Sequence, residues 1–153
     1  MGGSAEVHAL ERALAVKVEQ CKEPLSAQEV GNALYGLQGM GGSAEVHALL
    51  RALTVKVEQC KEPLSAQAVG NALYGLQGMG GSAEVHALLR ALTVKVEQCK
   101  EPLSAQEVGN ALYGLKGMGG SAEVHALLRA LTVKVEQCKE PLSAQTVGNA
   151  LYG

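Results

Sequence analysis

The sequence contains no Phe and no Trp, and Tyr occurs only four times in 153 residues. Aromatic side chains often supply much of the buried area of a protein core, so the core here must be built from Leu, Val and Ala. Long segments rich in Leu, Ala, Glu, Lys and Val favour helix over strand. The composition therefore predicts an all-α protein.

The sequence also lacks charge runs and long apolar runs. Its 13 basic and 15 acidic residues are spread evenly and give a formal net charge of −2, which is not the basic footprint of an electrostatically driven nucleic-acid or membrane binder. No apolar run of about 18 residues suggests a membrane span, and no export signal is recognisable. We expect an intracellular protein with no membrane partner.

What the sequence does have is a fixed period of 39 residues. Residues 1–39, 40–78 and 79–117 are near-identical copies, and residues 118–153 form a fourth that is three residues shorter. Such a period is typical of units that stack because none can bury its apolar face alone. We expect residues 1–153 to form a single repeat array, an α-solenoid of four two-helix repeats.

Each copy contains the signals for two helices, as the second copy shows. Ser43 is a good N-cap for a helix over residues 44–60. Pro63 ends that helix, because the residue before a proline is forced out of the helical region. Ser65 caps a second helix that runs to about Gln77. Each repeat is therefore expected to be a helix pair.

Two glycines, Gly70 and Gly75, lie inside the second helix of that copy. A Gly in a helix interior costs about 1 kcal/mol relative to Ala. We expect the close approach of a neighbouring helix to compensate for this cost.

One face of the first helix differs only in the first copy. Glu11 stands where later copies have Leu, and Ala15 stands where they have Thr. Residues at i and i+4 share a helix face, and a charge confined to the first copy is typical of a capping repeat. We expect Glu11 to be exposed, and Leu50, Leu89 and Leu128 to be buried against the preceding repeat.

The opposite end carries no such polar substitution. Val147 and Leu151 should there present the apolar surface that inner repeats bury. Because Glu11 would oppose head-to-tail stacking, we expect a weak homodimer in which two C-terminal ends pair about a two-fold axis.

The cysteines occur once in each repeat, at Cys21, Cys60, Cys99 and Cys138. A disulfide needs Cα atoms within about 7 Å, whereas stacked helices lie about 8–10 Å apart. We expect buried free thiols in a reducing setting.

The histidines His8, His47, His86 and His125 form a second ladder with the same spacing. A metal ion requires three or four ligands about 2 Å from one point, which side chains about 10 Å apart cannot provide. The sequence also lacks paired carboxylates, a Ser/His/Asp or Cys/His arrangement and a phosphate-binding Gly-rich loop. We expect no catalytic activity, metal or cofactor.

An amide and aromatic set recurs on one face of the second helix. An amide can hydrogen-bond to a base and an aromatic ring can stack on it, which is how helical-repeat RNA readers bind about one base per repeat. The alternative is structural, with Asn in a hydrogen-bonded ladder and Tyr packed with its hydroxyl in water. The residues are Gln28, Asn32, Tyr35, Gln67, Asn71, Tyr74, Gln106, Asn110, Tyr113, Gln145, Asn149 and Tyr152.

One position on this helix, occupied by Glu29, Ala68, Glu107 and Thr146, varies between copies. The variation invites comparison with a specificity code. The position also lies three residues after the capping serine, where Glu completes a capping box. That local role accounts for two of the four identities.

Residues 64–76, with the pattern Leu-Ser-Ala-Gln-x-Val-x-Asn-x-Leu-Tyr-x-Leu, are followed by Gly, a short turn and a Glu-x-x-x-Leu-Leu helix. This pattern resembles the octotricopeptide repeat and its bacterial relatives, and the resemblance covers every repeat. It implies a solenoid of helix pairs associated with organellar RNA binding and expression control.

We therefore expect modular binding of single-stranded RNA through the Gln/Asn/Tyr face. The alternative is a designed or natural scaffold, in which the same face binds a peptide or nothing. The near-identity of the copies fits either recent duplication or consensus design. RNA binding through phosphates would weaken steeply as salt rises, whereas peptide binding need not.

Overall fold

The computed structural model describes residues 3–151, and within that range every regular element is an α-helix, as the composition predicted. The helix pairs follow the sequence repeats. The bounds are α1 (Ala5–Gln20), α2 (Ala27–Tyr35), α3 (Ala44–Gln59), α4 (Ala66–Tyr74), α5 (Ala83–Gln98), α6 (Ala105–Gly114), α7 (Ala122–Glu136) and α8 (Ala144–Leu151).

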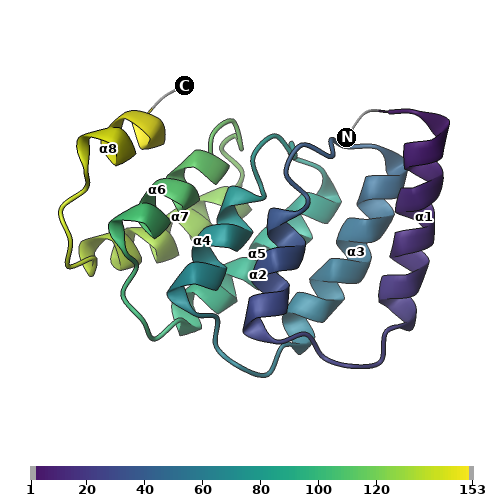
Figure 1. Cartoon of the computed structure of the whole chain (residues 1–153), viewed down its shortest axis with the longest axis horizontal. Coiled ribbons are helices and arrows are strands. Elements are labelled where there is room, and N and C mark those ends of the chain that lie inside the picture. The colour runs from purple at the N-terminus through teal and green to yellow at the C-terminus, as the bar shows by residue number, and fades with distance from the viewer. Residues whose placement is uncertain (1–2, 152–153) are drawn as a thin grey trace.

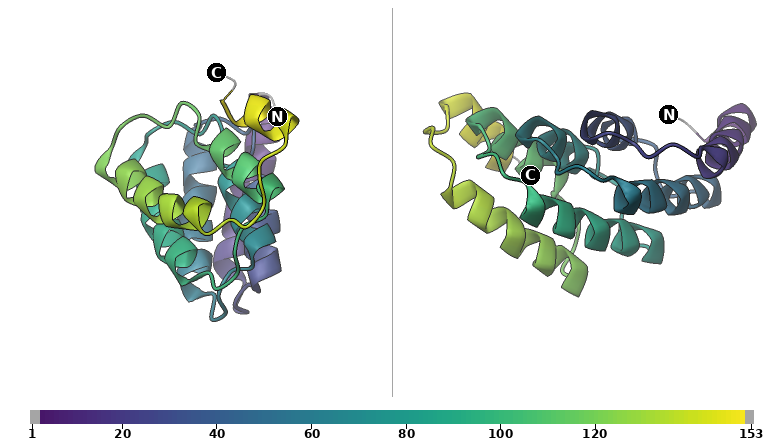
Figure 2. Two further views of the ribbon diagram at one scale, coloured as in Figure 1. Left: turned by 90° about the vertical axis from the view of Figure 1, so that its left-hand side faces the viewer. Right: turned by 90° about the horizontal axis from the view of Figure 1, so that it is seen from below.

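The helices form two rows (Figure 1). The long helices α1, α3, α5 and α7 pack side by side in chain order, and the shorter helices α2, α4, α6 and α8 do the same. The stack curves, with the long helices along its outer side and the short helices along its inner side (Figure 2). Within residues 3–151, no helix combines the length and the apolar character that crossing a membrane requires.

Serine caps start the helices at the predicted places. The hydroxyl of Ser43 accepts a hydrogen bond from the Val46 amide at 3.2 Å, and the hydroxyl of Ser65 accepts one from Ala68 at 3.1 Å. The short helices end earlier than predicted, α4 at Tyr74. The chain beyond Tyr74 tightens into turns with bonds to the third preceding residue.

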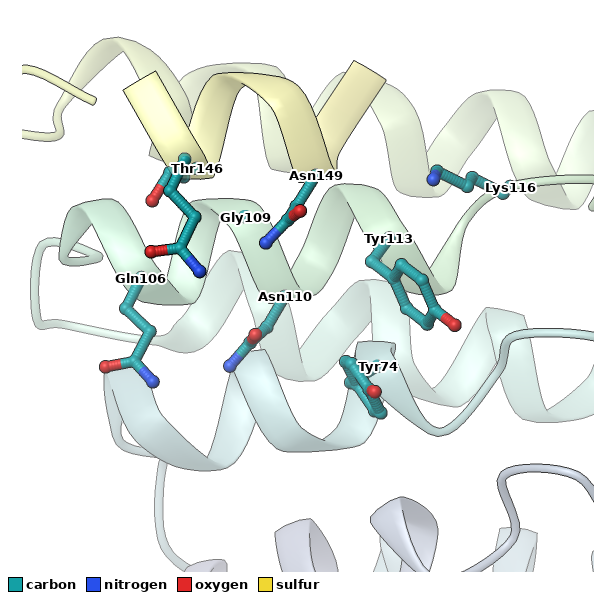
Figure 3. A pocket seen from close by; sticks show the side chains of 9 residues that line it. Tyr74, Gln106, Gly109, Asn110, Tyr113, Lys116, Thr146 and Asn149 are labelled. Atoms are coloured by element: carbon teal, nitrogen blue, oxygen red, sulfur yellow. The ribbon is translucent and has the colours of Figure 1, made fainter. Parts of the chain in front are cut away.

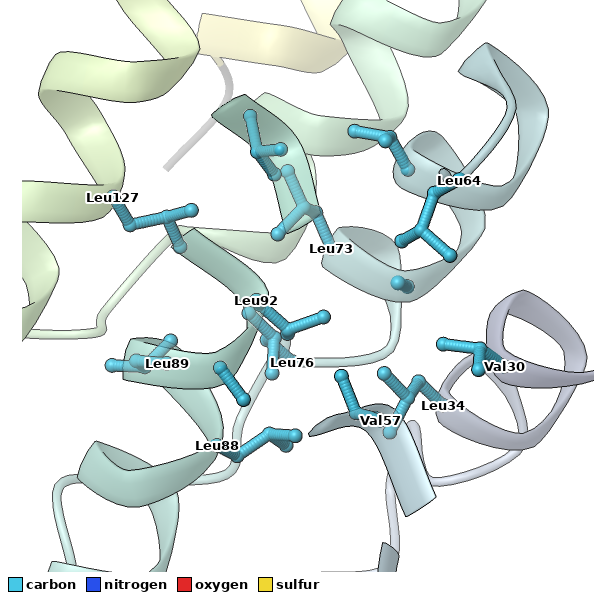
Figure 4. Close-up of a cluster of buried hydrophobic side chains, with 14 of the residues drawn as sticks. Val30, Leu34, Val57, Leu64, Leu73, Leu76, Leu88, Leu89, Leu92 and Leu127 are labelled. Atoms are coloured by element: carbon cyan, nitrogen blue, oxygen red, sulfur yellow. The ribbon is translucent and has the colours of Figure 1, made fainter. Parts of the chain in front are cut away.

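The core lies between the two rows and consists of aliphatic side chains. Leu73 and Leu76 from the inner row meet Leu88 and Leu92 from the outer row (Figure 4). All four are fully buried. This aliphatic core agrees with the absence of Phe and Trp.

Glycine lets the inner helices approach closely, as predicted. A Cβ built on Gly75 would lie 1.8 Å from the carbonyl oxygen of Leu34 in the preceding repeat. A Cβ built on Gly70 would lie 3.3 Å from the Cα of Glu107 in the following repeat. The two glycines of one repeat therefore serve contacts on opposite sides of it.

Two of the three Leu residues at the position of Glu11 are buried as predicted, but the predicted orientation of the long helices is wrong. Glu11 is 1% exposed, whereas Leu128, its counterpart in the fourth repeat, is 39% exposed. This position therefore packs against the following repeat. Instead, Leu10 and Leu14 are exposed on the face of α1 that no repeat covers, and their later counterparts are buried. Glu11 is consequently not a polar cap, and its Oε1 has no hydrogen-bond partner among the described residues.

At the opposite end the predicted exposure of apolar residues is confirmed, since Val147 is 41% and Leu151 76% exposed. The prediction of buried thiols is only partly correct. All four cysteines are free, but Cys21 is exposed and Cys138 half-buried, while Cys60 and Cys99 are buried. The two buried cysteines lie in repeats with a neighbour on each side, whereas Cys21 lacks a preceding repeat and Cys138 a following one.

Lysines buried on the outer row link each repeat to the one before it. Lys95 Nζ donates to the carbonyl oxygen of Cys60, the C-cap of α3, at 2.7 Å. Lys56 donates in the same way to Cys21, the C-cap of α1. A cation at a helix C-terminus satisfies free carbonyls and opposes the helix dipole.

Carboxylates make two further links between consecutive repeats. Glu101 Oε1 accepts a hydrogen bond from the Ala66 amide, the first residue of α4, at 2.6 Å. Arg51 on α3 forms an ion pair of 3.0 Å with Glu84 on α5. These contacts recur with the period of the sequence. Every internal interface thus has the same polar contacts.

Candidate binding groove

The predicted Gln, Asn and Tyr residues lie on one face of each short helix because their spacings of four and three residues bring them into line. In α4 these residues are Gln67, Asn71 and Tyr74. Ser65 fixes where the helix starts, and the Gly contacts fix its distance from its neighbours. The repeat then places the same three groups on every short helix.

Three hollows with shared lining residues run along the short helices, and we call them together the inner groove. Their volumes are about 210, 430 and 650 Å³. The largest lies over α6 and α8 (Figure 3). The predicted residues that line the groove are Gln28, Asn32, Tyr35, Gln67, Asn71, Tyr74, Gln106, Asn110, Tyr113, Gln145 and Asn149. Tyr152 lies outside the described residues.

The tyrosines of successive repeats stack on one another. The ring centroids of Tyr35 and Tyr74 are 5.1 Å apart, and those of Tyr74 and Tyr113 are 4.8 Å apart, with 18° between the planes of each pair. An inserted base needs about 7 Å, because it makes a contact of about 3.5 Å on each side. The rings as they stand therefore leave no room for a base between repeats.

The stack also affects the central ring. Burial raises the pKa of the Tyr74 hydroxyl, and the neighbouring Tyr113 and Tyr35 hydroxyls raise it further. Tyr74 is therefore a neutral phenol at neutral pH, able to donate and accept a hydrogen bond at the edge of the groove.

The Asn side chains along the groove make no hydrogen bond to another described residue. Within residues 3–151, the side chains of Asn32, Asn71 and Asn110 form no hydrogen bond, so the proposed ladder between neighbouring Asn residues is not observed there. A carboxamide offers one acceptor oxygen and two donor hydrogens. These groups are free to bind a ligand.

The groove is nearly uncharged. Among its described lining residues only Lys116 carries a charge. The ammonium of Lys116 lies 5.0 Å from the ring centroid of Tyr113, in range of a cation–π contact. The groove therefore has many hydrogen-bonding groups, but among its described lining residues it has positive charge only at Lys116.

The variable position on the short helices is a packing position. Ala68 is 3% exposed, and its Cα would lie 2.9 Å from a Cβ built on Gly31. Thr146 lies in the same way over Gly109. The predicted capping boxes are also present, and Glu107 completes one of them. Contact with the preceding helix therefore limits which residues can stand at this position, independently of any ligand.

The histidines lie on the opposite row, and two of them are close to the Glu residues of the Arg–Glu pairs. Nδ1 of His47 is 3.8 Å from Oε2 of Glu84, and His86 is placed similarly at 4.0 Å from Glu123. Among the described residues no group of His, Cys, Asp and Glu side chains could hold a metal ion. A hydrogen bond from its own backbone amide, with the nearby His47 and Arg51, holds the pKa of the Glu84 carboxyl below its ordinary value.

The buried lysines are the structural residues that sequence reasoning missed. From the sequence alone, a lysine in an amphipathic helix is expected to be solvent-exposed. Only its recurrence opposite the C-terminus of the preceding long helix could have indicated that it is buried.

Comparisons with protein-family models, with curated proteins and with solved structures found no match to this chain.

Proposed function

We propose that the inner groove binds single-stranded RNA, with the bases turned towards the amide side chains. One observation carries this proposal: Asn32, Asn71 and Asn110 line a continuous groove and have no hydrogen-bond partner among the described residues. Exposed bases present donors and acceptors on their edges, which carboxamides can match.

The tyrosine stack changes how such an RNA would bind. Bases lie across the groove against the amides, and the stacked rings of Tyr35, Tyr74 and Tyr113 form one wall instead of a series of slots. The phosphates then face solvent, because Lys116 is the single charged group among the described lining residues. We expect modest affinity and a shallow dependence on salt.

Fluorescence anisotropy with a pooled, labelled single-stranded RNA at low salt tests the proposal. Asn71→Ala with Asn110→Ala should weaken binding at least tenfold, because two amides are lost from the groove. The matched control is Gln59→Ala with Gln98→Ala, which removes two exposed amides from the ends of outer helices. The proposal fails if the parent protein shows no binding, or if the control pair weakens binding as much as the Asn pair.

An extended peptide is the second candidate, and the lack of charge in the groove favours it. A carboxamide can donate to and accept from a peptide unit at the same time, and a neutral backbone needs no cations. Pooled unstructured peptides in the same assay distinguish the two. Binding of peptides but not RNA, again abolished by Asn71→Ala with Asn110→Ala, would assign the groove to peptides.

A further inference from the structure

We propose that this chain assembles head to tail, with the uncovered face of α1 docking on the uncovered face of α7 and α8 of a second copy. The two faces are the two halves of the interface that already joins consecutive repeats inside the molecule. A second copy would continue the stack by the contacts that the chain makes three times within itself.

The uncovered face of α1 repeats the buried surface of α3. Leu10 and Leu14 are 52% and 39% exposed, whereas their counterparts Leu49 and Leu53 are 5% and 6% exposed against α1. Lys17, the counterpart of the buried Lys56, is also exposed. This face therefore carries the apolar residues and the cation with which an internal repeat meets its predecessor.

The uncovered face of α7 and α8 supplies the other half. Leu128 and Val147 are 39% and 41% exposed, although their counterparts Leu89 and Val108 are fully buried. A Cβ built on Gly109 would meet Thr146 at 2.8 Å, but one built on Gly148 would meet no described atom within 4 Å. The slot above Gly148 is open for the corresponding residue of another repeat.

The polar groups of the two faces match as well. Arg129 is the counterpart of Arg90, which pairs with Glu123 inside the chain, and Glu6 of a second copy occupies the position of Glu123. By the same correspondence Lys17 would donate to the Cys138 carbonyl, as Lys95 does to Cys60.

A third polar contact and a packing contact complete the correspondence. Glu23 would accept from the Ala144 amide, as Glu101 does from Ala66. Glu29 would lie over Gly148, as Glu107 lies over Gly70. Shape, apolar surface and charge therefore select the same partner.

The contact joins two different faces, so it is heterologous, and a linear stack of copies keeps one open face of each kind at its two ends. A two-fold C-terminal dimer was expected because Glu11 would oppose head-to-tail stacking. That reason does not hold, since Glu11 faces α3 and does not block the α1 face. Pairing of two C-terminal faces would also leave Arg129 without the Glu that its counterpart Arg90 has, and Gly148 without a residue to pack over it. Head-to-tail association creates neither of these mismatches.

Sedimentation velocity over a range of concentrations tests this proposal. The unmodified chain should form dimers, trimers and longer species in order as its concentration rises. Leu14→Glu blocks the α1 face, and Gly148→Leu fills the slot on the other face. Each variant alone should associate at least tenfold more weakly than the parent, while an equimolar mixture of the two should form a dimer that does not grow, because one open face of each kind remains.

Val16→Glu is the matched control. Val16 lies on the same helix as Leu14, and its counterparts Val55, Val94 and Val133 are all about half exposed, so this position lies outside every interface. It should leave association unchanged. A strictly monomeric parent would overturn the proposal. A dimer that survives Leu14→Glu would also overturn it and would indicate C-terminal pairing. A dimer that is lost with Val16→Glu would overturn it as well and would indicate contact through the flank.

Discussion

Glu11 is the residue at which the first repeat departs most from its copies, and it is almost completely buried between α1 and α3. Its carboxylate oxygen Oε1 has no hydrogen-bond partner among the described residues. Burying a polar group without a partner costs free energy. Glu11 therefore marks a local weakness in the first interface of the stack.

Replacing this side chain should stabilise the protein. Glu11→Leu restores the residue that the other copies have at this position, and it should raise the free energy of unfolding by about 1–3 kcal/mol. Urea denaturation followed by circular dichroism measures the change. Glu19→Leu, at an exposed Glu on the same helix, is the control, and an equal effect of both substitutions would contradict the account.

Three Glu carboxyls in the first turns of α3, α5 and α7 make the stability depend on pH. The pKa values of Glu45, Glu84 and Glu123 lie below their ordinary value of 4.5, first because of a hydrogen bond from the residue's own backbone amide. A carboxyl whose pKa is lowered by folding stabilises the protein above pH 4.5, and this contribution is lost as the pH falls through the folded-state value.

Thermal unfolding from pH 7 down to about pH 3 should therefore show the melting temperature falling below pH 4.5. Glu84→Gln removes one of these carboxyls, so its curve should start lower at pH 7 and fall less steeply than that of the parent. Parallel curves for the two proteins would show that Glu84 does not contribute to the acid sensitivity.

At the scale of the elements, glycine sets the distance between the inner helices. Gly75 has a right-handed helical conformation, so any residue could adopt its backbone angles, and the contact with Leu34 is what requires a glycine. This close approach also brings the tyrosine rings to within 5.1 Å of one another. One small residue therefore determines both the packing of α2 on α4 and the form of the groove wall.

Gly75→Ala should destabilise the protein by about 3 kcal/mol, because the added methyl group would overlap the backbone of α2. Gly36→Ala makes the same change at the same position of the first repeat. There the nearest atom is Ala33 O of its own chain segment at 3.4 Å, so the effect should be small. Denaturant titration of both variants checks the difference, and equal losses would contradict the assigned contact.

The helix starts were predictable from the sequence because Ser43 and Ser65 carry their capping signals locally. The orientation of the long helices was not. Leu49 and Leu50 are neighbours about 100° apart on one helix, and nothing in a single repeat says which of them meets the preceding repeat. The choice depends on the direction in which the stack grows, which is a property of the assembled array.

At the scale of the whole molecule, the residues of the groove were predictable, but the shape of its wall was not. The spacing of Gln67, Asn71 and Tyr74 places them on one helix face in any solenoid. The stacking of Tyr74 on Tyr113 arises because the inner row is compressed by its Gly contacts. A sequence pattern that predicts a ring on each helix does not predict the gap between rings.

The two proposals meet in the arrangement of the inner row. Head-to-tail assembly would place α2 of one copy beside α8 of the next and continue the inner groove across the joint. A longer RNA should then promote assembly of the parent chain and not of Leu14→Glu. The association of free chains and the binding of short RNA remain separate measurements, so either proposal can fail alone.

The central claim is that the amide side chains of the inner groove contact the ligand. A proton–nitrogen NMR titration of the labelled protein with pooled single-stranded RNA observes these amides directly. We predict that the side-chain signals of Asn71 and Asn110 shift most, while those of Gln59 and Gln98 on the outer row stay in place. Binding that leaves the Asn71 and Asn110 side-chain signals unchanged, or that shifts the outer row instead, would contradict the account.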